Sequence, residues 1–89
     1  MTSKSILVKG KVQGVFYRAS TMTEANNRKL KGYVKNLATG EVYIEVHGEE
    51  QAIHSLIEWC HDGPRFATVS EVKVENIPFE DLSEFEIRY

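Results

Sequence analysis

The sequence predicts an α+β sandwich in which two helices cover one face of an antiparallel sheet. Short stretches of strand-like residues alternate with glycine-containing turns, and two longer stretches carry apolar residues at helical spacing. Their order is β-α-β-β-α-β, with a possible additional edge strand. The 89 residues, 42% of them hydrophobic, suffice for one small core, so we expect residues 1–89 to form a single domain.

The first strand and the first helix are predicted from the N-terminal third of the chain. Residues 5–12 are rich in Ile, Leu and Val and end in glycine-containing sequence, which is typical of a strand. A loop with two glycines follows, and the spacing over residues 20–30 then predicts a helix. Thr21 and Glu24 have the spacing of a capping box, which places the start of this helix close to Thr21.

A hairpin and a second helix occupy the middle of the chain. Residues 33–37 and 42–47 are predicted strands joined by the short turn 38–40, and the second strand alternates strictly between apolar and polar residues. The acidic pair at 49–50 suits a helix N-terminus. An apolar stripe at i, i+3, i+4 and i+7 follows, before the sequence Gly63-Pro64 ends the helix; it consists of Ile53, Leu56, Ile57 and Cys60.

Two further strands are predicted near the C-terminal end. In the segment Val69–Val74 the apolar alternation slips by one residue, so a β-bulge near Ser70-Glu71 is needed to keep Val69 and Val72 on the same face. Phe85, Ile87 and Tyr89 alternate as in a short terminal strand.

The charge of the chain is unevenly distributed. Its net charge of -2 disfavours a nucleic-acid binder, which would usually carry a strong basic excess. Residues 1–37 nevertheless contain eight basic residues and one acidic residue, whereas residues 38–89 contain three and twelve. An acidic protein can therefore present a positive site to a small dianion.

Several features bear on where the protein acts. Cys60 is the only cysteine, so no intramolecular disulfide can form. Lysines interrupt the apolar runs of the N-terminal segment, which predicts neither a signal peptide nor a membrane span. We expect a cytoplasmic monomer that binds neither membranes nor nucleic acids.

The loop from Gly10 to Arg18 is the segment with the clearest chemical potential. A strand-to-helix loop can direct successive backbone N–H groups at an anion, and Gly14 would let the backbone approach a ligand closely. Arg18 adds a planar group that matches two phosphate oxygens. By spacing alone, an ordinary turn followed by a solvated arginine remains the simpler interpretation.

Five segments, in order, carry a pattern that spans nearly the whole chain: Gly10-Lys11-Val12-Gln13-Gly14-Val15-Phe16-Tyr17-Arg18, Gly32-Tyr33-Val34-Lys35-Asn36, Thr39-Gly40-Glu41-Val42, Gly63-Pro64-Arg65-Phe66-Ala67-Thr68-Val69 and Phe85-Glu86-Ile87-Arg88-Tyr89. This pattern resembles that of the acylphosphatase family. The first segment is the most specific of the five.

The resemblance implies a ferredoxin-like fold and the hydrolysis of small acyl phosphates to a carboxylate and inorganic phosphate. We expect this reaction to need no cofactor and no metal. The resemblance also implies that Arg18 binds phosphate and that Asn36 positions the attacking water, which requires the first two predicted strands to lie close together. The loop amides that it assigns to phosphate binding are those of Gln13, Gly14, Val15, Phe16, Tyr17 and Arg18.

The chain departs from the family pattern at a few positions. Tyr17 and Tyr33 replace a common phenylalanine and a common tryptophan, and both remain aromatic. Arg28 and Lys29 stand where a Leu-Gly pair is frequent. If the first helix ends in a left-handed turn, Lys29 carries a strain of order 1 kcal/mol that glycine would avoid.

The chain also contains candidate residues for other functions. His47, His54 and His61 recur every seven residues, but a solvated helix face explains them better than a metal site. Cys60 falls on the apolar stripe, which predicts a buried inert thiol rather than a nucleophile. A phosphate-binding module without turnover and an RNA-binding module, which would use Tyr33, Lys35 and Tyr43, remain as alternatives.

Overall fold

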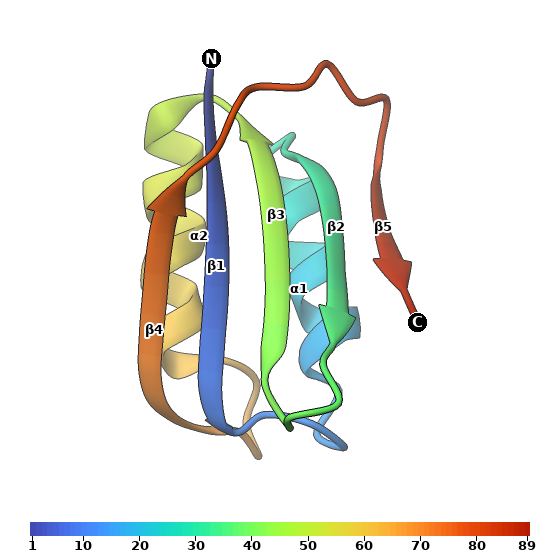
Figure 1. Ribbon diagram of the computed structural model, residues 1–89, viewed down its shortest axis with the longest axis vertical. Coiled ribbons are helices and arrows are strands. Elements are labelled where there is room, and N and C mark those ends of the chain that lie inside the picture. Colours follow the sequence, from blue (N-terminus) through green and yellow to red (C-terminus); the bar gives the residue numbers. More distant parts are fainter.

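The computed structural model describes all residues, 1–89, and contains five strands and two helices. Both helices lie on the same face of the sheet (Figure 1), which confirms the predicted fold class. The elements are β1 (Thr2–Lys11), α1 (Tyr17–Asn27), β2 (Lys31–Asn36), β3 (Val42–Gly48), α2 (Glu50–Asp62), β4 (Thr68–Asn76) and β5 (Phe85–Arg88).

The strands are arranged in the order β4-β1-β3-β2-β5. The first four pair antiparallel, but β5 pairs parallel with β2, so the sheet is mixed and the expectation of a wholly antiparallel sheet is wrong at this edge. The segment 77–84 crosses one end of the sheet from β4 to the opposite edge (Figure 1). Its eight residues span up to about 26 Å, enough to pass four strand spacings of about 4.8 Å.

One hydrophobic core fills the space between the sheet and the helices. The alternating residues Val42, Ile44 and Val46 of β3 are fully buried, as their pattern predicts. From α2, Ile53, Leu56 and Cys60 enter this core, while Ile57 is only partly buried. Neither helix is long and apolar enough to cross a membrane.

The start of α1 differs from the sequence prediction. The helix begins at Tyr17, and Thr21 lies one turn inside it, where its Oγ1 donates a hydrogen bond of 2.8 Å to the Tyr17 carbonyl. The predicted capping box is therefore wrong. The residue before the helix is Phe16, in a left-handed conformation (φ 64°), and its side chain makes no capping bond. The first helical N–H groups consequently remain available to another acceptor.

Helix α1 ends in a left-handed turn, which is the condition under which strain at Lys29 was expected. Lys29 has a φ of 59°. The amide of Leu30 donates to the Ala25 carbonyl (2.9 Å) and that of Lys29 to the Asn26 carbonyl (3.0 Å), which together form a Schellman motif. A lysine thus occupies a position that favours glycine.

The predicted bulge in β4 is also present. Lys9 pairs with Glu71 and Gly10 pairs with Val69, so Ser70 is the additional residue. Both Val69 and Val72 pack against the core as a result. Gly10 has a φ of 128°, and a side chain there would collide with the Thr68 carbonyl, so this close pairing requires glycine.

Candidate active site

The loop between β1 and α1 presents unpaired backbone donors. Gly14 (φ 74°) and Phe16 (φ 64°) both have left-handed backbone conformations, and the chain turns at these residues before α1 begins at Tyr17. The backbone N–H groups of residues 13–16 donate no hydrogen bond to another part of the protein. Such donors beside the positive end of a helix favour an anion.

Arg18 lies in the first turn of α1. Its half-buried side chain takes part in none of the ion pairs of the protein. The guanidinium carbon lies 5.0 Å from the centre of the Tyr89 ring, a cation–π contact. One face of the guanidinium is thereby held by an aromatic ring while its charge remains without a carboxylate partner.

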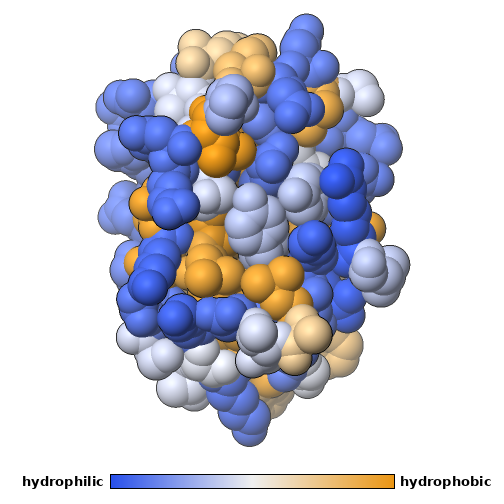
Figure 2. All heavy atoms as spheres, viewed as in Figure 1, coloured by the Kyte–Doolittle hydropathy of each residue, from blue (hydrophilic) through white to orange (hydrophobic).

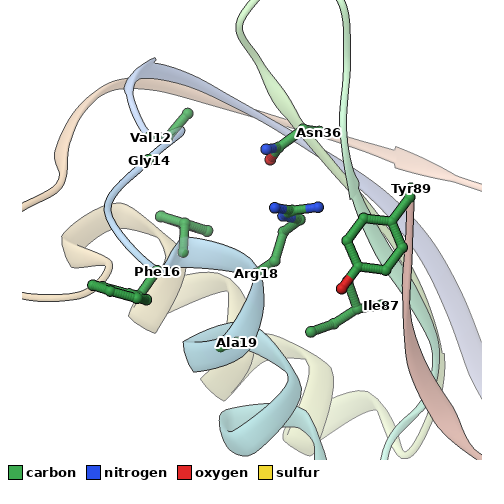
Figure 3. A pocket seen from close by; sticks show the side chains of 9 residues that line it. Val12, Gly14, Phe16, Arg18, Ala19, Asn36, Ile87 and Tyr89 are labelled. Carbon is green, nitrogen blue, oxygen red and sulfur yellow. The ribbon is translucent and has the colours of Figure 1, made fainter.

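Asn36, the last residue of β2, faces Arg18 (Figure 3). Strand β3 separates β1 from β2, but both pair antiparallel with it and so run in the same direction. The C-terminal ends of β1 and β2 therefore lie at the same end of the sheet. This arrangement brings Asn36 to the loop that follows β1, although the two strands are not neighbours.

The amide oxygen Oδ1 of Asn36 is buried and has no hydrogen-bond partner. Leaving a buried acceptor unpaired costs about 1–3 kcal/mol, so such atoms are rare in folded proteins. Because Asn36 lines a cavity, this oxygen is a candidate acceptor for a molecule bound there.

A cavity of about 290 Å³ unites these groups. It lies between the loop, the start of α1, the end of β2 and the C-terminal residues (Figure 3). Arg18 is the only charged residue among those that line it. The lining residues are Val12, Gly14, Phe16, Tyr17, Arg18, Ala19, Asn36, Ile87 and Tyr89.

The side chain of Gln13 links the loop to the hairpin. Its Nε2 donates hydrogen bonds to the carbonyl oxygens of Leu37 (2.8 Å) and Glu41 (2.9 Å), the two residues that flank the turn after Asn36. Sequence reasoning used only the backbone of Gln13 and missed this contact. No local sequence pattern predicts this contact, because Gln13 is separated from Leu37 by 24 positions and from Glu41 by 28 positions.

Tyr17 anchors the first turn of α1 to α2. Its hydroxyl donates a hydrogen bond of 2.7 Å to the Cys60 carbonyl, and burial raises its pKa far above the usual value. Gly63 makes room for the ring, since a Cβ there would lie 2.6 Å from it. The helical turn that carries Arg18 is therefore held against a second helix.

Cys60 is buried, as its place on the apolar stripe predicts. Burial raises the pKa of its thiol to about 12, so the thiolate is scarce at neutral pH. The nucleophile of thiol chemistry is the thiolate, and Cys60 lies away from the cavity lining.

The three histidines do not share one environment. His54 and His61 are exposed on α2, but His47 lies on β3 and is only 1% exposed, so the expectation of a solvated helix face is wrong for His47. Its Nδ1 lies 2.7 Å from the Ser3 hydroxyl and accepts the Glu80 N–H at 3.2 Å. No group of three or more metal-ligating side chains comes together in this structure.

The fold and the cavity define a ferredoxin-like α+β domain with a candidate anion site at the start of its first helix. The profile of the family described as Acylphosphatase matches residues 4–87. An acylphosphatase of Haloquadratum walsbyi is 47% identical over 87 residues, which cover 98% of this chain and 94% of the relative.

Two solved structures agree with this match. An acylphosphatase from Coxiella burnetii superposes with a TM-score of 0.95 at 45% identity, covering 98% of this chain and 92% of that one. An acylphosphatase from Bacillus subtilis gives a TM-score of 0.97 at 38% identity, covering 100% of both chains. The chain belongs to the acylphosphatase family, and its activity is that of an acylphosphatase, a hydrolase.

Proposed function

We propose that the cavity hydrolyses small acyl phosphates, with the phosphoryl group bound by Arg18 and by the backbone amides of residues 13–18. The guanidinium has no carboxylate partner, and the amides of the loop have no internal acceptor. Together they supply a positive charge and several aligned donors for the phosphoryl oxygens. These interactions stabilise the charge on the transferring group.

Asn36 holds the attacking water in this proposal. The observation that carries it is the buried, unpartnered Oδ1, which faces the cavity beside Arg18. A water that donates one hydrogen to this oxygen has its lone pair free for phosphorus. A neutral amide does this without placing a second negative charge beside the phosphoryl group, as a carboxylate would.

The reaction needs little proton transfer from the protein. The water oxygen forms a bond to phosphorus, the bond from phosphorus to the acyl oxygen breaks, and the carboxylate leaves with the bonding electrons. Its conjugate acid has a pKa of roughly 4 to 5, so it leaves without protonation. Both water protons end on the phosphate, the first passing to a phosphoryl oxygen, which serves as the base.

The products are one carboxylate and one inorganic phosphate. In this proposal the chain positions the phosphoryl group and the water, and it supplies no reactive side chain.

Three variants test these roles with acetyl phosphate as substrate. Arg18→Ala should lower kcat/KM by a hundredfold or more, about 3 kcal/mol of transition-state stabilisation, by comparison with other oxyanion donors. Arg18→Lys should recover little of this, because it lacks the planar pair of donors. Asn36→Ala should lower kcat while inorganic phosphate still competes with near wild-type affinity.

Arg65→Ala and Asn26→Ala are matched controls, because both residues are exposed and lie outside the cavity. Full hydrolysis by Asn36→Ala alongside an inactive Arg18→Ala would exclude the water-positioning role. Phosphate binding without any hydrolysis by the wild-type protein would instead indicate a binding module.

A further inference from the structure

The segment 77–84, which we call the strap, crosses one end of the sheet between β4 and β5 (Figure 1). Backbone hydrogen bonds hold both of its ends. The Ile77 N–H donates to the Ser3 carbonyl at 3.3 Å, and the Gly32 N–H donates to the Glu84 carbonyl at 3.1 Å. Between these ends, one hydrogen bond joins the strap to the rest of the protein, and its acceptor is a histidine side chain.

This histidine is His47, and the strap accounts for its burial. Ile44 and Val46 of β3 lie in the core, so the alternation of the strand places His47 on the helix-free face of the sheet. Figure 2 shows this face, on which hydrophobic and hydrophilic residues meet at the end that the strap crosses. The Phe79 ring of the strap lies edge-on to the imidazole, with 5.8 Å between the ring centres. A position on the open face is thereby almost fully buried.

The hydrogen bonds of His47 identify its protonation state in the closed strap. A backbone N–H can only donate, so the bond of 3.2 Å from the Glu80 N–H requires an unprotonated Nδ1. The Ser3 hydroxyl, 2.7 Å from the same Nδ1, donates to it as well. Nε2 therefore carries the proton and donates to the Glu45 carboxylate at 2.9 Å. The closed strap contains a neutral imidazole.

Protonation of His47 affects its three partners differently. The added proton binds Nδ1, which changes from an acceptor into a donor. The Glu45 carboxylate gains an ion pair with the imidazolium. The Ser3 hydroxyl can rotate and accept from Nδ1, because a hydroxyl is both donor and acceptor. The Glu80 N–H cannot accept, so the bond to the strap is the one that is lost.

Other charged groups also face the imidazole. They line a cavity of about 170 Å³ beneath the strap, which His47 shares with the end of α1, the start of β2 and the N-terminal residue. None of their side chains takes part in an ion pair, so Glu45 is the only charged side chain bonded to the ring. These groups are Lys29, Lys31, Glu80, Asp81 and the α-amino group of Met1.

We propose that His47 is a pH-sensitive latch: the neutral ring holds the middle of the strap against the sheet, and the protonated ring releases it. Histidine is the side chain that ordinarily changes charge between pH 5 and 8. The strap leads into β5, which carries Ile87 of the cavity lining. The latch itself does not depend on the proposed hydrolysis.

Backbone and histidine-ring NMR of the intact protein between pH 8 and pH 5 tests the latch. As the His47 ring is protonated, the order parameters of amides 79–82 should fall from about 0.85, typical of rigid backbone, to below about 0.6. The Glu80 amide shift should follow the same midpoint as the His47 ring, while the amides of α2 stay rigid. His54 and His61 are exposed on α2, so their titration provides internal references that should not move the strap.

His47→Asn separates the latch from other titrating groups. Asparagine does not titrate, and its Oδ1 occupies a place close to that of the imidazole Nδ1, where it can accept the Glu80 N–H. The strap of this variant should therefore stay ordered down to pH 5. His54→Asn is the matched control, and its strap should open as in the wild-type protein.

Three results would overturn the latch. The first is a wild-type strap that stays rigid while the His47 ring is protonated. The second is a His47 ring that stays neutral until the whole protein unfolds, because the latch would then never operate. The third is a His47→Asn strap that opens at the same pH as the wild-type strap, which would assign the opening to Glu80 or Asp81. The first two come from the wild-type protein alone, so they decide the question even if His47→Asn does not fold.

Discussion

Replacing Gln13 should lower the turnover of the enzyme more than its affinity for phosphate. The side-chain amide of Gln13 ties the loop to the carbonyls of Leu37 and Glu41, directly after Asn36. Gln13→Ala removes both bonds and frees the hairpin to move relative to the loop. The distance between the bound phosphoryl group and the water at Asn36 is then less well defined.

The size of both effects follows from the contacts. Each neutral hydrogen bond contributes about 0.5–1.5 kcal/mol. Leu37 O still accepts the Gly40 N–H (3.1 Å) and Glu41 O the Leu37 N–H (2.8 Å), so neither carbonyl is left unpaired. We therefore expect a loss of about 1–2 kcal/mol in unfolding free energy, and about a tenfold loss in kcat, since displacements near 1 Å can cost up to a hundredfold.

The loss of stability is measured by urea unfolding and the loss of turnover by kcat for acetyl phosphate. The affinity for phosphate is measured by the inhibition constant of inorganic phosphate. The inhibition constant should change less than threefold. Gln13→Glu should lower kcat and the unfolding free energy more than Gln13→Ala does, because its carboxylate faces two carbonyl oxygens. Gln51→Ala, on the exposed surface of α2, is the control. A Gln13→Ala protein that loses stability but keeps wild-type kcat would refute the positioning argument.

Two further predictions concern stability and reactivity. Lys29→Gly should raise the unfolding free energy by about 1 kcal/mol in urea titrations, because glycine accepts the left-handed conformation (φ 59°) without strain; Lys29→Ala keeps the Cβ and should not gain. The Cys60 thiol has its pKa raised by burial from 9.0 to about 12, so the unfolded thiol ionises first and its contribution to stability falls as pH rises from 9 toward 12. Unfolding curves of wild-type and Cys60→Ala proteins across this range should show the difference; parallel pH profiles would contradict it.

Local sequence patterns were enough to predict the elements in which apolar residues recur at a regular spacing. The alternation in β3 and the stripe in α2 each specify one apolar face, and burial of that face requires no knowledge of distant residues. The bulge at Ser70 was predictable for the same reason, because Val69 and Val72 can share a face only with one extra residue between them.

The start of α1 could not be read in this way. Thr21 and Glu24 have a valid capping spacing, yet the helix begins at Tyr17. Tyr17 is buried and its hydroxyl reaches the Cys60 carbonyl, 43 residues away. That tertiary contact extends the helix toward the loop and leaves its first N–H groups open to the cavity.

By itself the sequence determined the α+β class, the order of the elements and, through a specific loop pattern, the prediction that Arg18 and Asn36 share a phosphate site. Only the tertiary structure decided that β5 runs parallel to β2, that Gln13 ties the loop to the hairpin, and that Ile87 and Tyr89 complete the cavity wall. The physical reason is that hydrophobic periodicity acts within an element, whereas the edge strand and the cavity depend on segments that meet only after the sheet has formed.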